Sequence, residues 1–171
     1  GMGDKSNESG EPNVIWLQDL LDQKLGRGTC KVICPITDAF VGHHGALGGF
    51  VRIYLKQKQD RNKVAEIVQS ISGIEKVWTA ESVAKELEQP LDREGDLAVV
   101  ADKETVIGGS EKDHDLSALK GNRLRTHGSL HEANVPFILS EPLNEIYLKR
   151  AAERTLRSRE IFEYALNGTE I

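Results

Sequence analysis

Strand-type and helix-type hydrophobic patterns alternate irregularly between residues 13 and 109, and this order limits the folds open to the chain. Runs rich in β-branched residues predict strands over 29–34, 50–55, 74–78, and near 96–101 and 104–108. Helical spacing of apolar residues predicts helices over 60–71 and 80–88. Because the two kinds do not alternate one for one, we expect an α/β fold of the mixed α+β kind. In it, helices pack against a mixed β-sheet, without the regular series of a doubly wound fold.

A further helix is predicted near the start of this region. Apolar residues recur at helical spacing, Pro12 precedes them and Gly26 follows; they are Val14, Leu17, Leu20, Leu21 and Leu25. The twelve residues before this segment are small, polar and rich in glycine, and Gly1 before Met2 is typical of a residue left by tag removal. We therefore expect residues 1–12 to be a disordered tag remnant and leader.

The pattern changes after Gly109. Residues 110–134 carry little periodicity, "VPFIL" (135–139) predicts one more strand, and the sequence from Pro142 predicts a helix in two parts. Ser158 is a candidate N-cap of the second part and Gly168 a candidate end. We therefore expect three regions, comprising 1–12, an α/β region over 13–109 and a C-terminal segment over 110–171.

Composition excludes several classes of function. The chain of 171 residues is 39% hydrophobic and 29% charged, which suits one soluble domain. Its net charge of −5 opposes general affinity for nucleic acid or an anionic membrane, and no apolar run approaches the roughly 20 residues that span a bilayer. We expect a cytoplasmic protein without nucleic-acid or membrane partners.

Two cysteines, Cys30 and Cys34, lie four residues apart in the predicted strand 29–34. At ~3.3 Å per residue their Cα atoms would be ~13 Å apart, whereas a disulfide needs ~4.4–6.8 Å. The spacing is not C-x-x-C and no third cysteine is present, so buried free thiols are expected rather than a metal or redox site.

Five histidines are the candidate metal ligands: His43 and His44 in "VGHHGALGG", His114 beside Asp113 and Asp115, and His127 with His131. His127 and His131 have H-x-x-x-H spacing, but Gly128 and Pro136 make a helix doubtful there. "VGHHGALGG" suits a tight turn before the next strand or a backbone-lined anion cradle, and the turn is favoured. Thr126 and Ser129 flank His127, yet the sequence contains neither a G-x-S-x-G elbow nor a phosphate-binding P-loop.

Four stretches, in order, resemble the C-terminal part of the phosphonoacetate hydrolases, a family of the alkaline phosphatase superfamily related to the nucleotide pyrophosphatase/phosphodiesterases. They are "PNVIWLQDLLD", "PITDAFVGHHGALGGFVRIYL", "GDLAVVADKETVIGGSEKDHDLSAL" and "LRTHGSLHEANVPFIL". In the last stretch the family usually has Ser and Gly where this chain has Thr126 and Ser129. The resemblance implies a small cap region followed by the return of the chain to a core sheet.

The resemblance also implies a metal. Family members hold two zinc ions with Asp and His side chains, and His127 matches the last of these ligands. The family's threonine nucleophile, its substrate-binding lysine and asparagine, and the other zinc ligands lie upstream, so no catalytic residue is assigned within this chain. Met2 stands where the family has the methionine of Asp-His-Gly-Met. A fragment that is inactive alone is therefore expected, its complete enzyme hydrolysing the C–P bond of phosphonoacetate to acetate and phosphate.

Two alternatives stay open. The chain could be a stand-alone α/β module that binds a partner or a small anion, or part of a related phosphodiesterase acting on a phosphodiester. The expected partner in the hydrolase is a small phosphonate substrate, and homo-oligomers through exposed apolar surface such as "VPFIL" are also expected.

Overall fold

The structure, a computed structural model, describes residues 2–36 and 46–170, which form two compact units. Unit 1 is Gly1–Ala133 and unit 2 is Asn134–Ile171. This boundary differs from the one expected at Gly109. Residues 110–133 belong to unit 1 because Leu119 and Leu124 are buried in a cluster with Leu47 and Val106.

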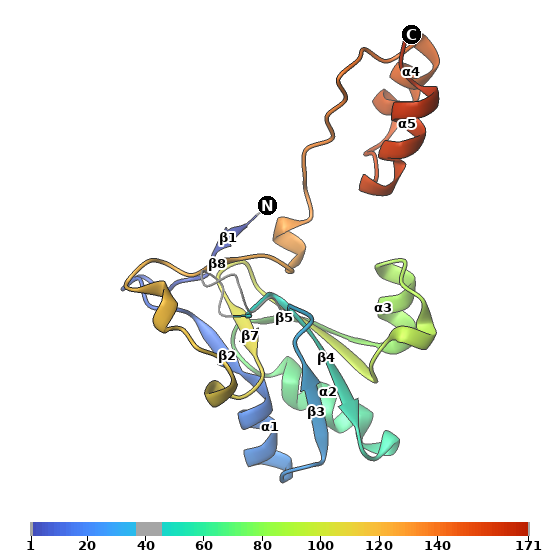
Figure 1. Cartoon of the computed structure of the whole chain (residues 1–171). Coiled ribbons are helices and arrows are strands. Elements are labelled where there is room, and N and C mark those ends of the chain that lie inside the picture. Colours follow the sequence, from blue (N-terminus) through green and yellow to red (C-terminus); the bar gives the residue numbers. More distant parts are fainter. Residues whose placement is uncertain (1, 37–45, 171) are drawn as a thin grey trace. The chain divides into compact units, whose positions relative to one another are not determined.

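A four-stranded antiparallel sheet is the centre of unit 1 (Figure 1). Its strand order is β3 (Cys30–Ile33), β4 (Phe50–Leu55), β6 (Leu97–Ala101) and β5 (Ile74–Thr79). The strands predicted at these positions are confirmed, as is the mixed α/β class. Among the described residues, parallel pairing occurs only between β2 (Val14–Trp16) and β7 (Val106–Gly108).

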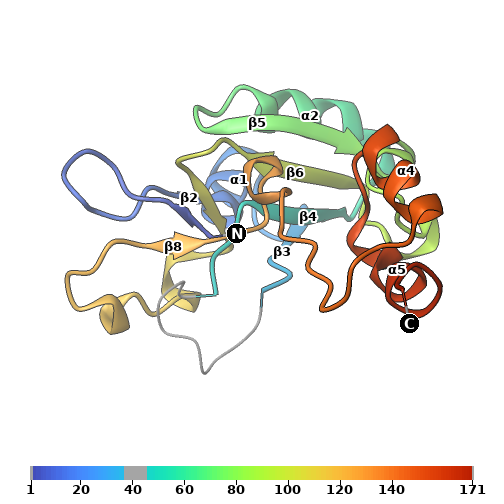
Figure 2. The same cartoon turned by 90° about the horizontal axis from the view of Figure 1, so that it is seen from above.

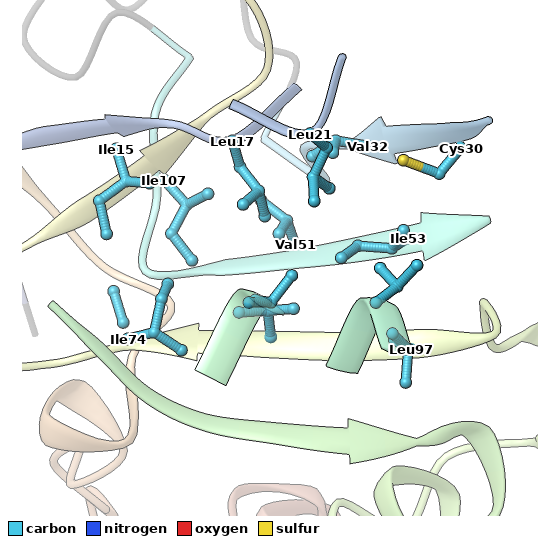
Figure 3. Close-up of a cluster of buried hydrophobic side chains, with 14 of the residues drawn as sticks. Ile15, Leu17, Leu21, Cys30, Val32, Val51, Ile53, Ile74, Leu97 and Ile107 are labelled. Atoms are coloured by element: carbon cyan, nitrogen blue, oxygen red, sulfur yellow. The ribbon is translucent and has the colours of Figure 1, made fainter. Parts of the chain in front are cut away.

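Helices cover both faces of this sheet because side chains alternate between the faces along each strand. Helices α1 (Leu17–Leu25) and α2 (Arg61–Gln69) lie along one face (Figures 1 and 2), and Leu17, Leu21 and Val64 there are fully buried. Figure 3 shows this core, with Val51, Ile53 and Leu97 of the sheet facing the helices. Helix α3 (Ala80–Glu86) packs on the other face through Val83 against Trp78, Ala98 and Val100.

Residues 14–16 are a strand, whereas the sequence predicted them as part of the first helix. Val14 pairs with Val106 and Trp16 with Gly108 in parallel register, and the helix begins at Leu17. Gly108 permits this contact, since a Cβ there would lie 2.4 Å from the ring of Trp16. The pairing partner lies far away in sequence, so local periodicity could not indicate it.

The opening residues are structured, which corrects the expectation of a disordered leader. Strand β1 (Gly3–Asp4) pairs antiparallel with β8 (Arg125–Thr126), and Lys5 is fully buried. The polar composition of residues 1–12 indicated disorder because a polar segment buries little apolar surface. Here, backbone pairing and a buried ion pair hold the segment instead.

Unit 2 is a helical pair, α4 (Glu145–Glu153) and α5 (Ile161–Asn167). Tyr164 of α5 is 1% exposed, and its ring meets that of Tyr147 edge-on at 5.0 Å. Gly168 ends α5 as predicted, but Ser158 begins a 3-10 turn and the N-cap of α5 is Glu160. Across both units, the 3-10 turns within the described ranges are η1 (Lys58–Asp60), η2 (Leu91–Arg93), η3 (Glu111–Asp113), η4 (Ser117–Leu119), η5 (Leu130–Glu132) and η6 (Ser158–Glu160).

The strand predicted over 135–139 is wrong, since this segment has no regular structure. Pro136 lacks a backbone donor, and no described strand pairs with the segment, so its apolar pattern is not used in a sheet. Val135 and Ile138 are 54% and 79% exposed, and on α5 Phe162 and Leu166 are each 74% exposed.

None of the helices in the described ranges combines the length and apolar character needed to cross a bilayer.

Candidate functional site

The backbone at His127 is held from two sides. His127 directly follows β8, whose Thr126 is fully buried and donates its hydroxyl to Leu47 O at 2.7 Å. The carbonyl of His127 accepts a hydrogen bond from Gly49 N at 2.9 Å. The segment 47–49, which closes the "VGHHGALGG" stretch, therefore fixes the position of the candidate ligand.

A tight turn follows His127. Gly128 has φ +105°, a conformation that favours glycine, and Ser129 begins a capping box with Glu132. Ser129 donates to Glu132 Oε2 from its backbone N at 2.9 Å and from Oγ at 2.7 Å. Gly49 permits the turn to lie this close, because a Cβ there would come within 2.6 Å of Ser129 N.

A buried ion pair anchors the turn. Lys5 Nζ donates to Glu132 Oε1 at 2.9 Å and to the carbonyl of Lys103 at 2.7 Å. Burial alone would raise the pKa of Glu132, but hydrogen bonds from Ser129 and Lys5, together with the charge of Lys5, outweigh it and hold that pKa below its ordinary value. Sequence reasoning missed both residues, although "SLHE" (129–132) carries the S-x-x-E signature of a capping box.

The imidazole of His127 is exposed, and it forms no hydrogen bond with any side chain in the described ranges. A solvent-facing ring on a fixed backbone suits a metal ligand, because little conformational freedom is lost when it binds. However, the described residues contain no group of three or more His, Cys, Asp or Glu side chains placed to hold a metal ion. Zinc sites in proteins use three or four protein ligands, so His127 does not form one with the other described residues.

The remaining histidines are in other places. His131 Nε2 lies 2.7 Å from Glu75 Oε2. The sequence made an α-helix over His127 and His131 doubtful, and the structure has a 3-10 turn at Leu130–Glu132 instead. His114 Nε2 accepts a hydrogen bond from Gly109 N at 3.1 Å, and its ring lies 5.4 Å from that of Trp16. His43 and His44 lie outside the described residues.

The acidic residues beside His114 stabilise turns. Asp115 accepts a hydrogen bond from Ser117 N, and hydrogen bonds from the side chain and then the backbone of Ser117 lower its pKa. The backbone N of Asp113 donates to Ser110 O. Asp19, which sequence analysis did not single out, holds this segment against α1. It accepts from Ser110 Oγ at 2.6 Å and from Glu111 N at 2.9 Å.

Both cysteines are free thiols, as predicted. Cys30 is buried, and Cys34 is half-buried with its Sγ 4.0 Å from Ile107 O. Burial raises the pKa of Cys34 to about 11, so the neutral thiol dominates at neutral pH. Burial raises the pKa of the Cys30 thiol as well.

No protein-family model matches the chain. Two crystal structures of phosphonoacetate hydrolase from Sinorhizobium meliloti 1021, one in complex with phosphonoformate and one with phosphonoacetate, are similar to it. Each is 40% identical to this chain with a TM-score of 0.80, over 98% of this chain and 40% of the enzyme chain. The resemblance seen in the sequence is thus confirmed, and this chain spans about two fifths of the enzyme chain it matches.

Proposed function

We propose that this chain, similar over nearly its whole length to part of phosphonoacetate hydrolase, is a C-terminal fragment of such an enzyme and contributes His127 to its zinc site. That likeness is the observation that carries the proposal. In the complete enzyme the reaction is hydrolysis of phosphonoacetate to acetate and phosphate. The chain by itself is inactive, since no nucleophile or full ligand set is assigned within it.

The chain's own contribution is to hold one imidazole in place. Gly49 N fixes the carbonyl of His127, and the Ser129–Glu132 box fixes the turn that follows it. By the resemblance, the remaining ligands come from the part of the enzyme that lies upstream of this chain. Zinc, when bound, stabilises negative charge on phosphoryl oxygens and lowers the pKa of an attacking hydroxyl.

The reaction places a further demand on the complete site. Hydrolysis forms a P–O bond and breaks the C–P bond, so the electron pair of the broken bond passes to the departing carbon. The neighbouring carboxylate of phosphonoacetate delocalises that pair before the carbon takes up a proton. The site therefore has to accommodate a substrate with a carboxylate and a phosphonate, and His127 contributes on the phosphonate side.

A chimeric enzyme tests this function. The matching part of the Sinorhizobium meliloti enzyme is replaced by this chain, and phosphate release from phosphonoacetate is measured. Release is expected. His127→Ala is expected to reduce it by more than about 100-fold, because the loss of a metal ligand should exceed the roughly 10–100-fold effect of losing a residue that only hydrogen-bonds to a ligand. His131→Ala is the matched control and is expected to retain activity, because that imidazole pairs with Glu75.

A folded chimera whose activity is the same with and without His127 would contradict the role of this residue. Zinc calorimetry on the chain alone tests the incomplete ligand set. Weak binding and no phosphate release are expected. Tight stoichiometric binding that is lost in His127→Ala would show that the chain completes its own site and would favour a stand-alone module.

A further inference from the structure

A surface hollow in unit 1 lies where four segments come together. It is bordered by the end of α1, the loop from α1 to β3, the residues after β4 and the start of α2. Its volume is about 410 Å³. Ligand pockets in proteins commonly measure about 300–1,000 Å³, so a small molecule of several heavy atoms fits this space.

Cations dominate the lining of the hollow. Lys24, Arg27, Lys56 and Lys63 contribute to it, and Asp60 is the one carboxylate among its lining residues. None of the four cations forms an ion pair within 4.0 Å with a residue of the described ranges. The hollow therefore has a formal charge of +3, four cations less one carboxylate, on a chain whose net charge is −5.

The cations of the neighbouring surface are arranged differently. Lys58 pairs with Asp96, and Arg61 pairs with Glu81. Both lie within a few residues of Lys56 and Lys63, yet their charges are balanced by carboxylates. The lining cations thus differ from these neighbours in forming no ion pair within 4.0 Å with the described residues.

Two apolar side chains, Leu25 and Val64, are among the lining residues of the hollow. Val64 is fully buried and Leu25 packs against the same core cluster. Carbonyls at the end of α1 would repel an anion, but the single hydroxyl proton of Thr29 lies within reach of both Leu25 O, 3.0 Å from Oγ1, and Gly26 O, 2.8 Å from it. Buried apolar neighbours strengthen the field of the cations, and a carbonyl that accepts a hydrogen bond opposes that field less.

We propose that this hollow is a binding site for a small anion with two or more negative charges, of the phosphate or phosphonate class. Four cations from two stretches of the chain meet at the hollow without an ion pair within 4.0 Å in the described ranges, which distinguishes it from a solvated helix face, where charges of both signs alternate. The site does not depend on His127 or on the hydrolase function proposed above.

Inorganic pyrophosphate is the probe, titrated by calorimetry into the metal-free full chain at low salt. Saturable binding of one pyrophosphate per chain is expected, weakening as salt is added. Lys56→Gln combined with Lys63→Gln is expected to weaken binding about tenfold or more, because two attractive charges are removed. Asp60→Asn is expected to tighten it, because the one opposing charge is lost while the side-chain shape is kept.

Lys85→Gln combined with Lys149→Gln is the matched control, since both lysines are exposed and neither lines the hollow. This control removes the same total charge and is expected to leave binding unchanged. Failure to saturate, or an equal loss of affinity in the two double variants, would overturn the proposal. Tryptophan fluorescence during urea unfolding verifies that each variant is folded, because Trp16 and Trp78 both lie in unit 1.

Discussion

Lys5 Nζ lies 2.9 Å from Glu132 Oε1, and the two side chains are only 0% and 6% exposed. The pair joins positions 127 residues apart, linking the segment after β1 to the turn that follows His127. The same carboxylate accepts both hydrogen bonds from Ser129. One buried ion pair therefore stabilises both the N-terminal segment and the candidate metal ligand's turn.

Replacing Lys5 by methionine is expected to lower the free energy of unfolding of unit 1 by about 3 kcal/mol or more, because an uncompensated buried carboxylate typically costs about 3–5 kcal/mol. Urea unfolding followed by tryptophan fluorescence measures it. Lys31→Met changes an exposed lysine of β3 and is expected to stay within about 0.5 kcal/mol of the wild type. Equal losses in the two variants would contradict a structural role for the ion pair.

The pKa of Glu132 is lowered in the folded chain, which predicts a pH dependence of stability. A lowered pKa means that the ionised carboxylate stabilises the fold above its unfolded pKa of about 4.3, and that this contribution is lost as the pH falls through the folded-state value. The free energy of unfolding should therefore decrease less steeply on acidification in Glu132→Gln than in the wild type. Identical slopes between pH 6 and the acid transition would disprove the assignment.

Gly49→Ala is expected to destabilise unit 1 by about 1–3 kcal/mol, the usual cost of overpacking, because its Cβ would lie 2.6 Å from Ser129 N. In the chimeric enzyme it should also reduce phosphate release, since the hydrogen bond from Gly49 N to His127 O would be displaced. Gly109→Ala is the control. The atom nearest to a Cβ at Gly109 lies 3.7 Å away, so this variant should unfold like the wild type.

Cys34 is expected to react slowly with iodoacetamide. With a pKa of about 11, its thiolate fraction at pH 8 is on the order of 0.1%, and only the thiolate reacts. In a Cys30→Ser background, alkylation of the folded chain should be at least about 100-fold slower than that of the urea-unfolded chain, whose thiol has a pKa of about 8.5. Mass spectrometry measures both rates, and rates within tenfold of each other would show that the thiol is not protected by burial.

The sequence by itself determined most of unit 1. The positions of β3 to β6 and of α1 to α3 follow from periods that are local, since a strand or helix that buries one face carries its pattern in adjacent residues. The likeness to phosphonoacetate hydrolase, and with it His127, also came from contiguous motifs. "VPFIL" had the same kind of local pattern but formed no strand, because a strand also requires a partner edge.

Tertiary structure alone decided which distant residues meet. Val14 became a strand residue because Val106 lies beside it, and the polar opening segment became ordered because Glu132 receives Lys5. The four cations of the hollow come from two stretches, 24–27 and 56–63, which are about 30 residues apart in sequence, so their meeting on one surface follows only from the packing of the two stretches against each other. Pairing and charge balance depend on distances in space, whereas the hydrophobic pattern of a chain reports only which face of each element is buried.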